Sequence, residues 1–368
     1  MRLERAELVH VALPLAASFR TGVSALSTCE SLLVRVEGGG VTGWGEVVAD
    51  TRPSYSPETI TTARHVLRDF LVPAVAAQPL ASVEDALARL DWVRGHPMAK
   101  AGLELALWDW WGRANNQSVA ALLGGTRARV DVGVSVGLAD SAAQLAAGLE
   151  RFRAEGYARF KLKVTPAWLE APLAAARATL GDAATLAADA NGTFSSADTS
   201  RLAALTGLAF LEQPLAWDDL VAHAALRRAG GIPVCLDESI GSLAALDSGL
   251  ALGAFDVLNV KPGRVGGLLA AKACLARAHQ AGKHTFVGGM LETAIGRAGN
   301  VALASLPTVT LASDLSATAR YLDEDLGAPF VLGAGSTLEV PRGAGLGIAI
   351  DEAVVQRRTV ARETVFAA

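Results

Sequence analysis

Cysteine is scarce in this sequence. The 368 residues contain only Cys29, Cys235 and Cys274, which are far apart, odd in number and without a Cys-x-x-Cys pair. This pattern argues against a disulfide framework and against a cysteine-based zinc site, and it is typical of a protein from a reducing compartment. A cytoplasmic protein is therefore expected.

Long hydrophobic runs and an excess of charge of one sign are also missing. No apolar run reaches the roughly 18 residues of a membrane-spanning helix, and residues 1–20 lack the basic and apolar regions of a signal peptide. The formal net charge is −4, which gives no electrostatic reason to expect nucleic acid or an anionic membrane as a partner.

Lysine is the third scarce residue, with six positions among 33 basic residues. A lysine can lose its proton when it is buried or close to other positive charges, whereas an arginine effectively cannot. The positions that carry lysine are therefore candidates for proton transfer. They are Lys100, Lys161, Lys163, Lys261, Lys272 and Lys283.

Short runs of β-branched and aliphatic residues recur about every 25 residues from residue 130 onward. Helix-like segments separate them and often end in glycine, as helices do. Eight strands alternating with helices predict an α/β fold with a parallel (β/α)₈ barrel of the TIM type. A doubly wound open sheet is the rival, but no Gly-x-Gly-x-x-Gly turn follows the first strand. The expected strands are 130–138, 159–164, 184–191, 208–215, 232–239, 255–262, 283–290 and 308–314.

The pattern before the barrel is different. Residues 1–125 combine antiparallel-strand patterns such as RAELVHVALPL with helical segments such as MAKAGLELALWDWWGRANNQ, which predicts an α+β domain. The barrel domain is expected over residues 126–320. Residues 321–368 contain short strand-like pieces and are expected to pack back on the first domain.

Charged residues stand at the carboxyl ends of five consecutive expected strands. Because the active site of a parallel barrel lies at this end, their side chains should converge on one pocket. A single acidic residue at a strand end is most often a helix N-cap, but five charged groups in register are not readily explained by coincidence. They follow one another at 26, 23, 25 and 24 residues, in the series Lys163, Asp189, Glu212, Asp237 and Lys261.

The residue types in this series suit one kind of chemistry. Three carboxylates without histidine or cysteine form a hard oxygen site that favours Mg²⁺, with Mn²⁺ as the alternative. Lys161 shares a strand face with Lys163, so the second of these should have a lowered pKa and be able to act as a general base. The set predicts proton abstraction next to a carboxylate, with the metal offsetting the negative charge and a lysine on each face.

At these residues the chain resembles the enolase superfamily, whose members use a lysine or histidine base with Mg²⁺. Lys261 disfavours the mandelate-racemase type, which has a histidine base on a later strand. The longer segments GWGEVVADTRPSYSPET, HPMAKAGLELALWD and GGMLETAIGRAGN are similar to the o-succinylbenzoate synthase / N-succinylamino acid racemase (N-acylamino acid racemase) family. That family belongs to the muconate-lactonizing subgroup, whose short segments are matched by Lys161-Leu-Lys163, Asp189-Ala-Asn191, Glu212-Gln-Pro214, Asp237-Glu-Ser239 and Asn259-Val-Lys261.

The resemblance implies a modified barrel whose mouth is capped by the N-terminal α+β domain. It implies Asp189, Glu212 and Asp237 as ligands of one divalent cation. It also implies Lys163 and Lys261 as the catalytic pair, with a small-molecule carboxylate as substrate. A homo-oligomer is expected.

Further positions follow from the same resemblance. Loops near Phe19 and Tyr55 would close over the succinyl side of the substrate. Arg264 matches an arginine of the racemase-competent branch, although a basic residue in this loop could equally be a surface charge. The role of Asp314 stays open. The remaining expected substrate-binding residues are Ser135, Lys161, Asn191, Gly289, Met290 and Leu291.

The implied reaction is the dehydration of 2-succinyl-6-hydroxy-2,4-cyclohexadiene-1-carboxylate to 2-succinylbenzoate, a step of menaquinone synthesis. N-succinylamino acid racemization in the same site is the main alternative, because two lysines around an enediolate permit both reactions. Muconate cycloisomerase and dipeptide epimerase come next, but Ser313-Asp314-Leu315 lacks the Asp-x-Asp expected of the epimerases. A barrel kept only for binding should have lost a ligand or a lysine, and none is lost.

Overall fold

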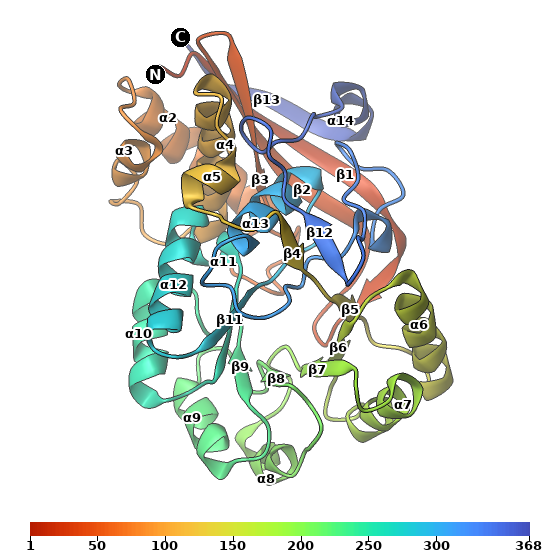
Figure 1. The fold of residues 1–368 in the computed structure, drawn as a ribbon. Coiled ribbons are helices and arrows are strands. Elements are labelled where there is room, and N and C mark those ends of the chain that lie inside the picture. The colour runs from red at the N-terminus through yellow and green to blue at the C-terminus, as the bar shows by residue number, and fades with distance from the viewer.

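The computed structural model describes residues 1–368. An antiparallel sheet and the helices that cover it form a cap, which lies above a curled parallel sheet in Figure 1. The expected α/β fold with an N-terminal capping domain is confirmed. In the cap the strand order is β13-β1-β2-β3, so the last strand of the chain pairs with the first. The strands of the cap are β1 (Arg5–Arg20), β2 (Ala25–Gly38), β3 (Val41–Val47) and β13 (Thr359–Ala367).

Helices of the cap cover the sheet, and α4 lies directly against β3. Glu58 accepts from the backbone N–H groups of Met98 and Ala99 at 2.7 and 3.1 Å, which satisfies free donors at the start of α4. The helices are α1 (Ile60–Val66), α2 (Val72–Ala76), α3 (Val83–Ala88), α4 (Pro97–Ala114) and α5 (Val119–Leu123), with a π-helical turn at Leu67–Leu71, and α14 (Glu352–Arg358) precedes β13.

The parallel sheet has seven strands in the order β11-β10-β9-β8-β7-β6-β5, with helices around its outside (Figure 1). Its strands are β5 (Val134–Val136), β6 (Arg159–Lys163), β7 (Thr185–Asp189), β8 (Leu211–Glu212), β9 (Val234–Leu236), β10 (Val257–Val260) and β11 (His284–Val287). Its helices are α6 (Ala142–Glu155), α7 (Glu170–Leu180), α8 (Thr199–Ala203), α9 (Leu220–Ala229), α10 (Leu243–Leu252), α11 (Pro262–Val265), α12 (Leu268–Gln280) and α13 (Ala294–Ala304).

The eighth expected strand, 308–314, is the main correction to the fold. It forms no regular strand; single bridges join Ser313 to Val132 and Asp314 to Gly288. The segment still hydrogen-bonds to both neighbours, since the Asp314 N–H donates to the Val287 carbonyl and the Ser313 N–H to the Asp131 carbonyl, at 2.9 and 2.8 Å. The barrel therefore closes through two isolated contacts instead of a ladder.

The first expected barrel strand is divided. Residues 129–131 form β4 (Arg129–Asp131), which pairs with β12 (Thr337–Glu339) outside the barrel, and only β5 joins the parallel sheet. Gly133 lies between the two pieces, and a Cβ there would meet the Arg159 side chain at 2.5 Å. Glycine thus lets the chain pass close to β6 where the direction changes.

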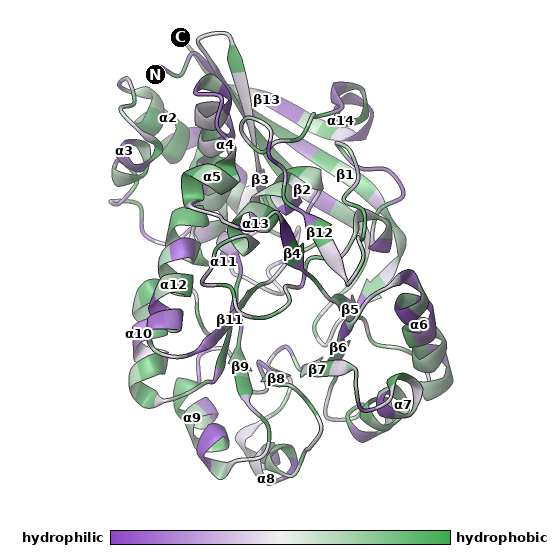
Figure 2. Ribbon diagram, viewed as in Figure 1, coloured by the Kyte–Doolittle hydropathy of each residue, from purple (hydrophilic) through white to green (hydrophobic).

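Local sequence explains the alternation of strands and helices. The barrel strands are short; β9, seen in green in Figure 2, and β10 are buried along their whole length. Serine begins many of the helices: Ser141 accepts from the Gln144 N–H, and Ser242 from the Ala245 N–H. Gly156 ends α6 with a φ of 107°, in the left-handed region that glycine tolerates.

One continuous apolar core links the cap and the barrel, with Leu8 and Val34 on the cap side and Leu258 and Leu275 on the barrel side. The cap is thereby held in a fixed place over the barrel mouth. A second small cluster fills the barrel centre and consists of Ala187, Phe210, Cys235, Val257 and Phe286.

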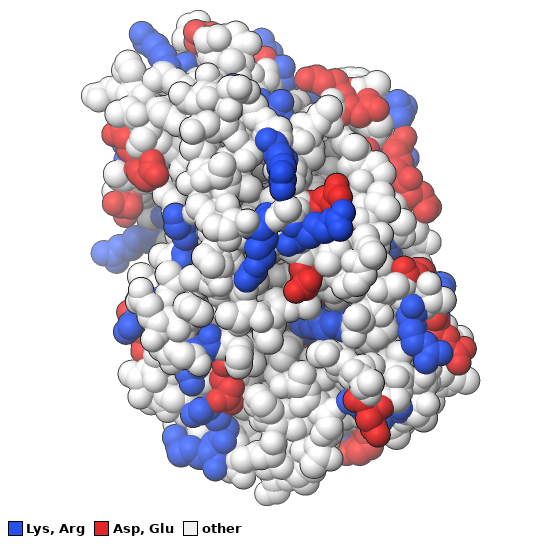
Figure 3. All heavy atoms as spheres, viewed as in Figure 1, with Lys and Arg blue, Asp and Glu red and all other residues white.

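Charged side chains of both signs are interspersed over the face shown in Figure 3, between wide uncharged areas. None of the helices is both long enough and apolar enough to cross a membrane. The three cysteines are free and buried.

Candidate active site

Strand β6 brings three cations into the barrel. Successive side chains of a strand point to opposite faces, so Arg159, Lys161 and Lys163 lie on one side of β6. They are 4, 3 and 9% exposed, and their register places Ser135 beside Lys161 and Asp189 beside Lys163. The sequence prediction that Lys161 and Lys163 share the interior face agrees with this arrangement.

Three carboxylates stand at the ends of the next strands. Asp189 ends β7, Glu212 ends β8 beside it, and Asp237 follows β9 directly. Their exposed fractions are 1, 0 and 0%. Buried carboxylates are unfavourable unless they are paired, so this end of the barrel needs several cations.

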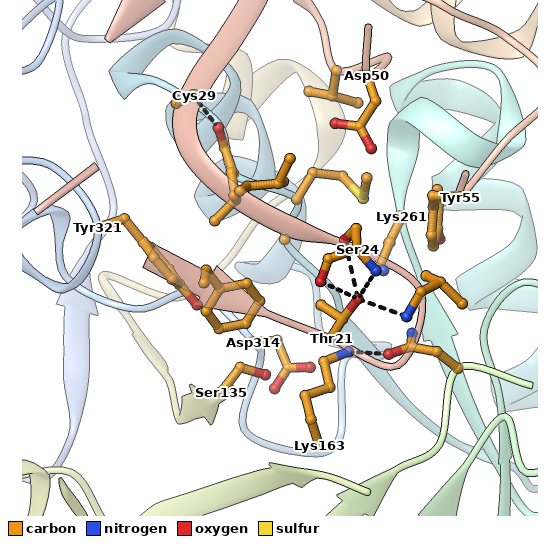
Figure 4. Close-up of a pocket in the computed structure, with 18 of the residues that line it drawn as sticks. Thr21, Ser24, Cys29, Asp50, Tyr55, Ser135, Lys163, Lys261, Asp314 and Tyr321 are labelled. Carbon is orange, nitrogen blue, oxygen red and sulfur yellow. Dashed lines mark hydrogen bonds between the residues drawn. The ribbon is translucent and has the colours of Figure 1, made fainter. Parts of the chain in front are cut away.

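Lysine side chains supply that positive charge from two sides. Lys163 donates to Asp189 at 2.6 Å, and Lys161 donates to Glu212 at 2.8 Å. Lys261, which follows β10, donates to Asp237 at 2.8 Å. Figure 4 shows Lys163 and Lys261 approaching the pocket from different sides.

The two outer lysines differ in their tendency to hold a proton. Burial lowers the pKa of Lys163, although the charge of Asp189 opposes this shift, and the positive charge of Lys161 adds to the lowering. Burial alone would also lower the pKa of Lys261, but Tyr55 and the nearby carboxylates raise it above its ordinary value. In this arrangement Lys163 therefore holds its proton less tightly than Lys261.

The donor set fits a hard divalent cation. Asp189, Glu212 and Asp237 offer only oxygen, and two further oxygens, Glu238 Oε2 and Asn259 Oδ1, are buried without a hydrogen-bond partner. No three acidic side chains already surround one point at ligand distance, because the lysine ammonium groups lie against their oxygens.

Asp314 lies on the closing segment of the barrel and pairs with both Arg159 and Lys161. Arg159 in turn lies over the rings of Phe210 and Phe286, 5.4 and 4.9 Å from their centroids. Its burial lowers its pKa to about 10. Asp314 thus neutralises the lower cations of β6 and has little capacity left for a substrate.

The cap completes a pocket of about 120 Å³ over these groups (Figure 4). The Tyr55 hydroxyl donates to Asp237 at 3.1 Å, and its ring lies 4.6 Å from Lys261 Nζ. Phe19 meets Tyr321 edge to face at 5.6 Å between centroids. The predicted residues that line the pocket are Phe19, Tyr55, Ser135, Lys161, Lys163, Asp189, Asn191, Lys261, Gly289, Met290 and Leu291.

Arg264 takes a different place from the other expected substrate-binding residues. It does not line the pocket; it pairs with Asp237 and donates to the Ile240 and Asn259 carbonyls. Glu212 and Asp237 likewise do not line the pocket.

Several residues of the site were given no role from the sequence. Asn259 donates to Glu212 at 2.8 Å, and its two-residue spacing from Lys261 was a usable signal for a shared face. Glu30 and Asp50 line the cap side of the pocket. Nothing in the sequence pattern shows which cap residues face the barrel.

Known proteins resemble this chain along its whole length. Residues 4–124 match the mandelate racemase / muconate lactonizing enzyme N-terminal domain, and residues 144–354 match the enolase C-terminal domain-like family. An N-succinylamino acid racemase of Amycolatopsis sp is 44% identical over 353 residues, 95% of each chain. An o-succinylbenzoate synthase of Geobacillus stearothermophilus is 40% identical over 370 residues, 100% of this chain and 97% of the relative. The crystal structure of an enolase superfamily member from Listeria innocua superposes with a TM-score of 0.95 at 31% identity, over all of both chains.

Proposed function

Since the chain belongs to the mandelate racemase / muconate lactonizing enzyme family of the enolase superfamily, we propose that it is an o-succinylbenzoate synthase that also racemises N-succinylamino acids. The observation that carries this proposal is the position of Lys163 and Lys261 on two sides of one pocket, with buried carboxylates between them. Both reactions begin with removal of a proton next to a carboxylate, so one site can perform both.

The carboxylates and the two lysines have separate roles in the dehydration. Asp189, Glu212 and Asp237 would hold Mg²⁺, which supplies positive charge against the substrate carboxylate when it is bound. Lys163 takes the proton from the carbon that bears this carboxylate. The C–O bond to the neighbouring hydroxyl then breaks, and the hydroxide leaves as water with the proton from Lys163. Lys261 stabilises the negative charge of the enediolate from the opposite face.

Racemization uses the same residues without loss of a group. One lysine removes the α-proton of the N-succinylamino acid, and the other gives a proton to the opposite face. The cap supports this chemistry because its residues, Phe19 and Tyr55 among them, line the pocket beside the barrel groups.

A dipeptide epimerase is a weaker candidate. Asp314, the acidic residue of this segment, is engaged with Arg159 and Lys161. The adjacent Ser313 and Leu315 leave the Asp-x-Asp pattern incomplete.

The proposal is tested by assaying the purified protein with Mg²⁺ for dehydration of the cyclohexadiene carboxylate and for racemization of N-succinylamino acids. Lys163→Ala and Lys261→Ala should each lower both rates by roughly 10³-fold, because Lys163→Ala removes an acid–base group from both reactions and Lys261→Ala removes one from racemization and a stabilising charge from dehydration. Lys272→Ala, at an exposed site on α12, serves as the control and should keep the wild-type rates. Removing divalent cations with a chelator should abolish both activities, and Mg²⁺ or Mn²⁺ should restore them.

Near-wild-type rates in either lysine variant would contradict the two-lysine assignment. Negligible dehydration beside efficient racemization would leave the racemase as the main role. A menaquinone gene neighbourhood would favour the synthase, and a neighbourhood with a succinyltransferase and an amidase would favour the racemase.

A further inference from the structure

The carboxylates that line the pocket differ in their partners. Three of them contact a basic side chain, and these are Asp189, Asp314 and Glu30. The fourth, Asp50, forms no ion pair with a lysine, an arginine or a histidine. A carboxylate that is partly removed from water is unfavourable without a compensating charge. Asp50 therefore leaves one negative charge of the pocket uncompensated by the protein.

The position of Asp50 is fixed by the fold of the cap. The residue follows β3 closely, and the Ile60 N–H at the start of α1 donates to its backbone carbonyl at 3.0 Å. Its side chain is half-buried and lines the pocket. Figure 4 shows Asp50 on the same side of the pocket as Tyr55 and Lys261. The carboxylate is thus held at one side of the pocket instead of extending into bulk solvent.

Glu30 adds negative charge near Asp50. Burial raises the pKa of Asp50, and the charge of Glu30 raises it further, against the opposing effect of the Ser54 side chain. The charged form of Asp50 is therefore disfavoured by its surroundings. A cationic group placed against this carboxylate would remove the penalty and form a charge-assisted hydrogen bond.

Arg320 provides the opposite charge on the other side of the pocket. Its guanidinium lies 4.7 Å from the ring centroid of Tyr321 and 5.6 Å from that of Phe19, and it donates to the Ser135 carbonyl at 3.1 Å. Its Nε atom is buried without a hydrogen-bond partner. Figure 4 shows Tyr321 and Ser135 across the pocket from Asp50. One side of the pocket therefore has an arginine behind its wall, and the other carries an unpaired carboxylate.

This asymmetry fits a substrate with two unlike arms. The succinyl arm of an N-succinylamino acid ends in a carboxylate, which Asp50 repels and Arg320 attracts. The succinyl arm is thereby directed toward the side of Arg320, and the amino-acid side chain extends toward Asp50. A side chain that ends in an ammonium or guanidinium group would neutralise Asp50, whereas an apolar one would bury the carboxylate further without a partner.

We propose that Asp50 is a specificity-determining residue that selects N-succinylamino acids with a cationic side chain, N-succinylarginine and N-succinyllysine. This inference rests on the proposed racemization in the same site. The cyclohexadiene carboxylate of the dehydration carries no cation, so the selection applies to racemization alone.

The test compares substrates that differ in charge but little in shape. N-succinyl-L-arginine is paired with N-succinyl-L-citrulline, in which a neutral urea group replaces the guanidinium, and N-succinyl-L-lysine is paired with N-succinyl-L-norleucine. Polarimetry of the purified protein with Mg²⁺ gives kcat and KM for each. The wild type should prefer the charged member of each pair by about 20-fold in kcat/KM, the order expected for a hydrogen bond to a charged group, and mostly through KM.

Asp50→Asn keeps the shape of the side chain and removes its charge. It should reduce the preference for arginine over citrulline to less than about twofold, because the charge-assisted bond is lost. Asp50→Glu keeps the charge and should keep most of the preference. Glu150→Gln, on the exposed side of α6, is the matched control for a lost negative charge and should keep the wild-type preference. The wild-type preference needs no variant, so the proposal is tested even where Asp50→Asn does not fold.

Equal kcat/KM values of the wild type for the two members of each pair would overturn the inference, and so would an undiminished preference in Asp50→Asn. Racemization of none of the four substrates would overturn the racemase activity of the proposed function and this inference with it. The two failures are therefore distinguishable.

Discussion

The few lysines of the chain are concentrated where proton transfer requires them. Lys161, Lys163 and Lys261 are 3, 9 and 8% exposed in the barrel mouth, whereas Lys272 is exposed on a helix. Arginine provides most of the remaining positive charge, including the buried Arg159 below the site. Scarcity of lysine was therefore an informative signal, because an arginine in the same positions could not change its charge.

Arg264 shows the limit of inference for single residues. Because Arg264 follows Lys261 by three residues, the sequence predicts that it contacts the substrate. In the structure it does not line the pocket, and its contact with substrate stays a prediction. In the structure it is 7% exposed and shares Asp237 with Lys261. We infer that it stabilises the Asp237 carboxylate.

Arg264→Gln should lower the free energy of unfolding by about 3 kcal/mol, because a buried carboxylate loses a cation and two backbone carbonyls lose a donor. Urea unfolding measures the effect. Arg277→Gln is the control: its pair with Asp247 leaves both side chains 49% exposed, so the loss should stay below about 1 kcal/mol. Similar losses in the two variants would show that the Arg264 contacts contribute little.

At the scale of elements, glycine sets the distance between β3 and α4. A Cβ at Gly45 would lie 2.0 Å from the Gly102 carbonyl oxygen and 2.5 Å from the Ala106 nitrogen. Both are backbone atoms of α4, so no side-chain rotation could make room. The close contact keeps α4 against the sheet of the cap, next to the segment that carries Tyr55.

Gly45→Ala should therefore destabilise the protein by about 3 kcal/mol, the upper range for overpacking, with a matching fall in the thermal midpoint. Gly148→Ala is the paired control on α6, at a half-buried position where a Cβ meets nothing within 4 Å. It should raise stability by roughly 0.5–1 kcal/mol, because alanine is the better helix residue. A neutral Gly45→Ala would mean that the strand and helix can separate without cost.

On the scale of the whole molecule, buried acids of the cap bind the helices of the barrel. Glu46 on β3 accepts from the Thr293 and Gly296 N–H groups at 3.0 and 2.8 Å, at the start of α13. Glu104 on α4 accepts from the Leu269 N–H at 2.9 Å, at the start of α12. A carboxylate suits the positive end of a helix, so these contacts fasten the cap over the site.

Glu104 should make stability depend on pH. Burial raises its pKa from an ordinary 4.5 to about 7, against the lowering effect of the Leu269 N–H. A raised carboxyl pKa means that the folded protein binds more protons, so its contribution is full below pH 4.5 and is lost as the pH rises through 7. The shift corresponds to roughly 3 kcal/mol.

Glu104→Gln cannot ionise and should remove that part of the slope of unfolding free energy between pH 5 and 8. Urea titrations at several pH values would show a flatter profile than the wild type, with the exposed Glu150→Gln as the control for a lost surface charge. An unchanged slope would mean that Glu104 is already ionised in the folded protein at pH 5.

The sequence alone determined the barrel, the cap before it and the five charged strand ends. These follow from local periodicity and from the rule that parallel strands end at one edge, so Lys163, Asp189 and Lys261 had to lie near one another. The proposed domain limits, the cytoplasmic location and the homo-oligomer stay predictions.

Only the tertiary structure decided the rest. It replaced the strand at 308–314 by two bridges, turned Arg264 toward Asp237, and brought Glu238 to Asn191. It also selected Glu30 and Asp50 among the cap residues that face the pocket. The physical reason is that these contacts depend on turn conformations and on packing between segments far apart in the chain, and no local pattern specifies either.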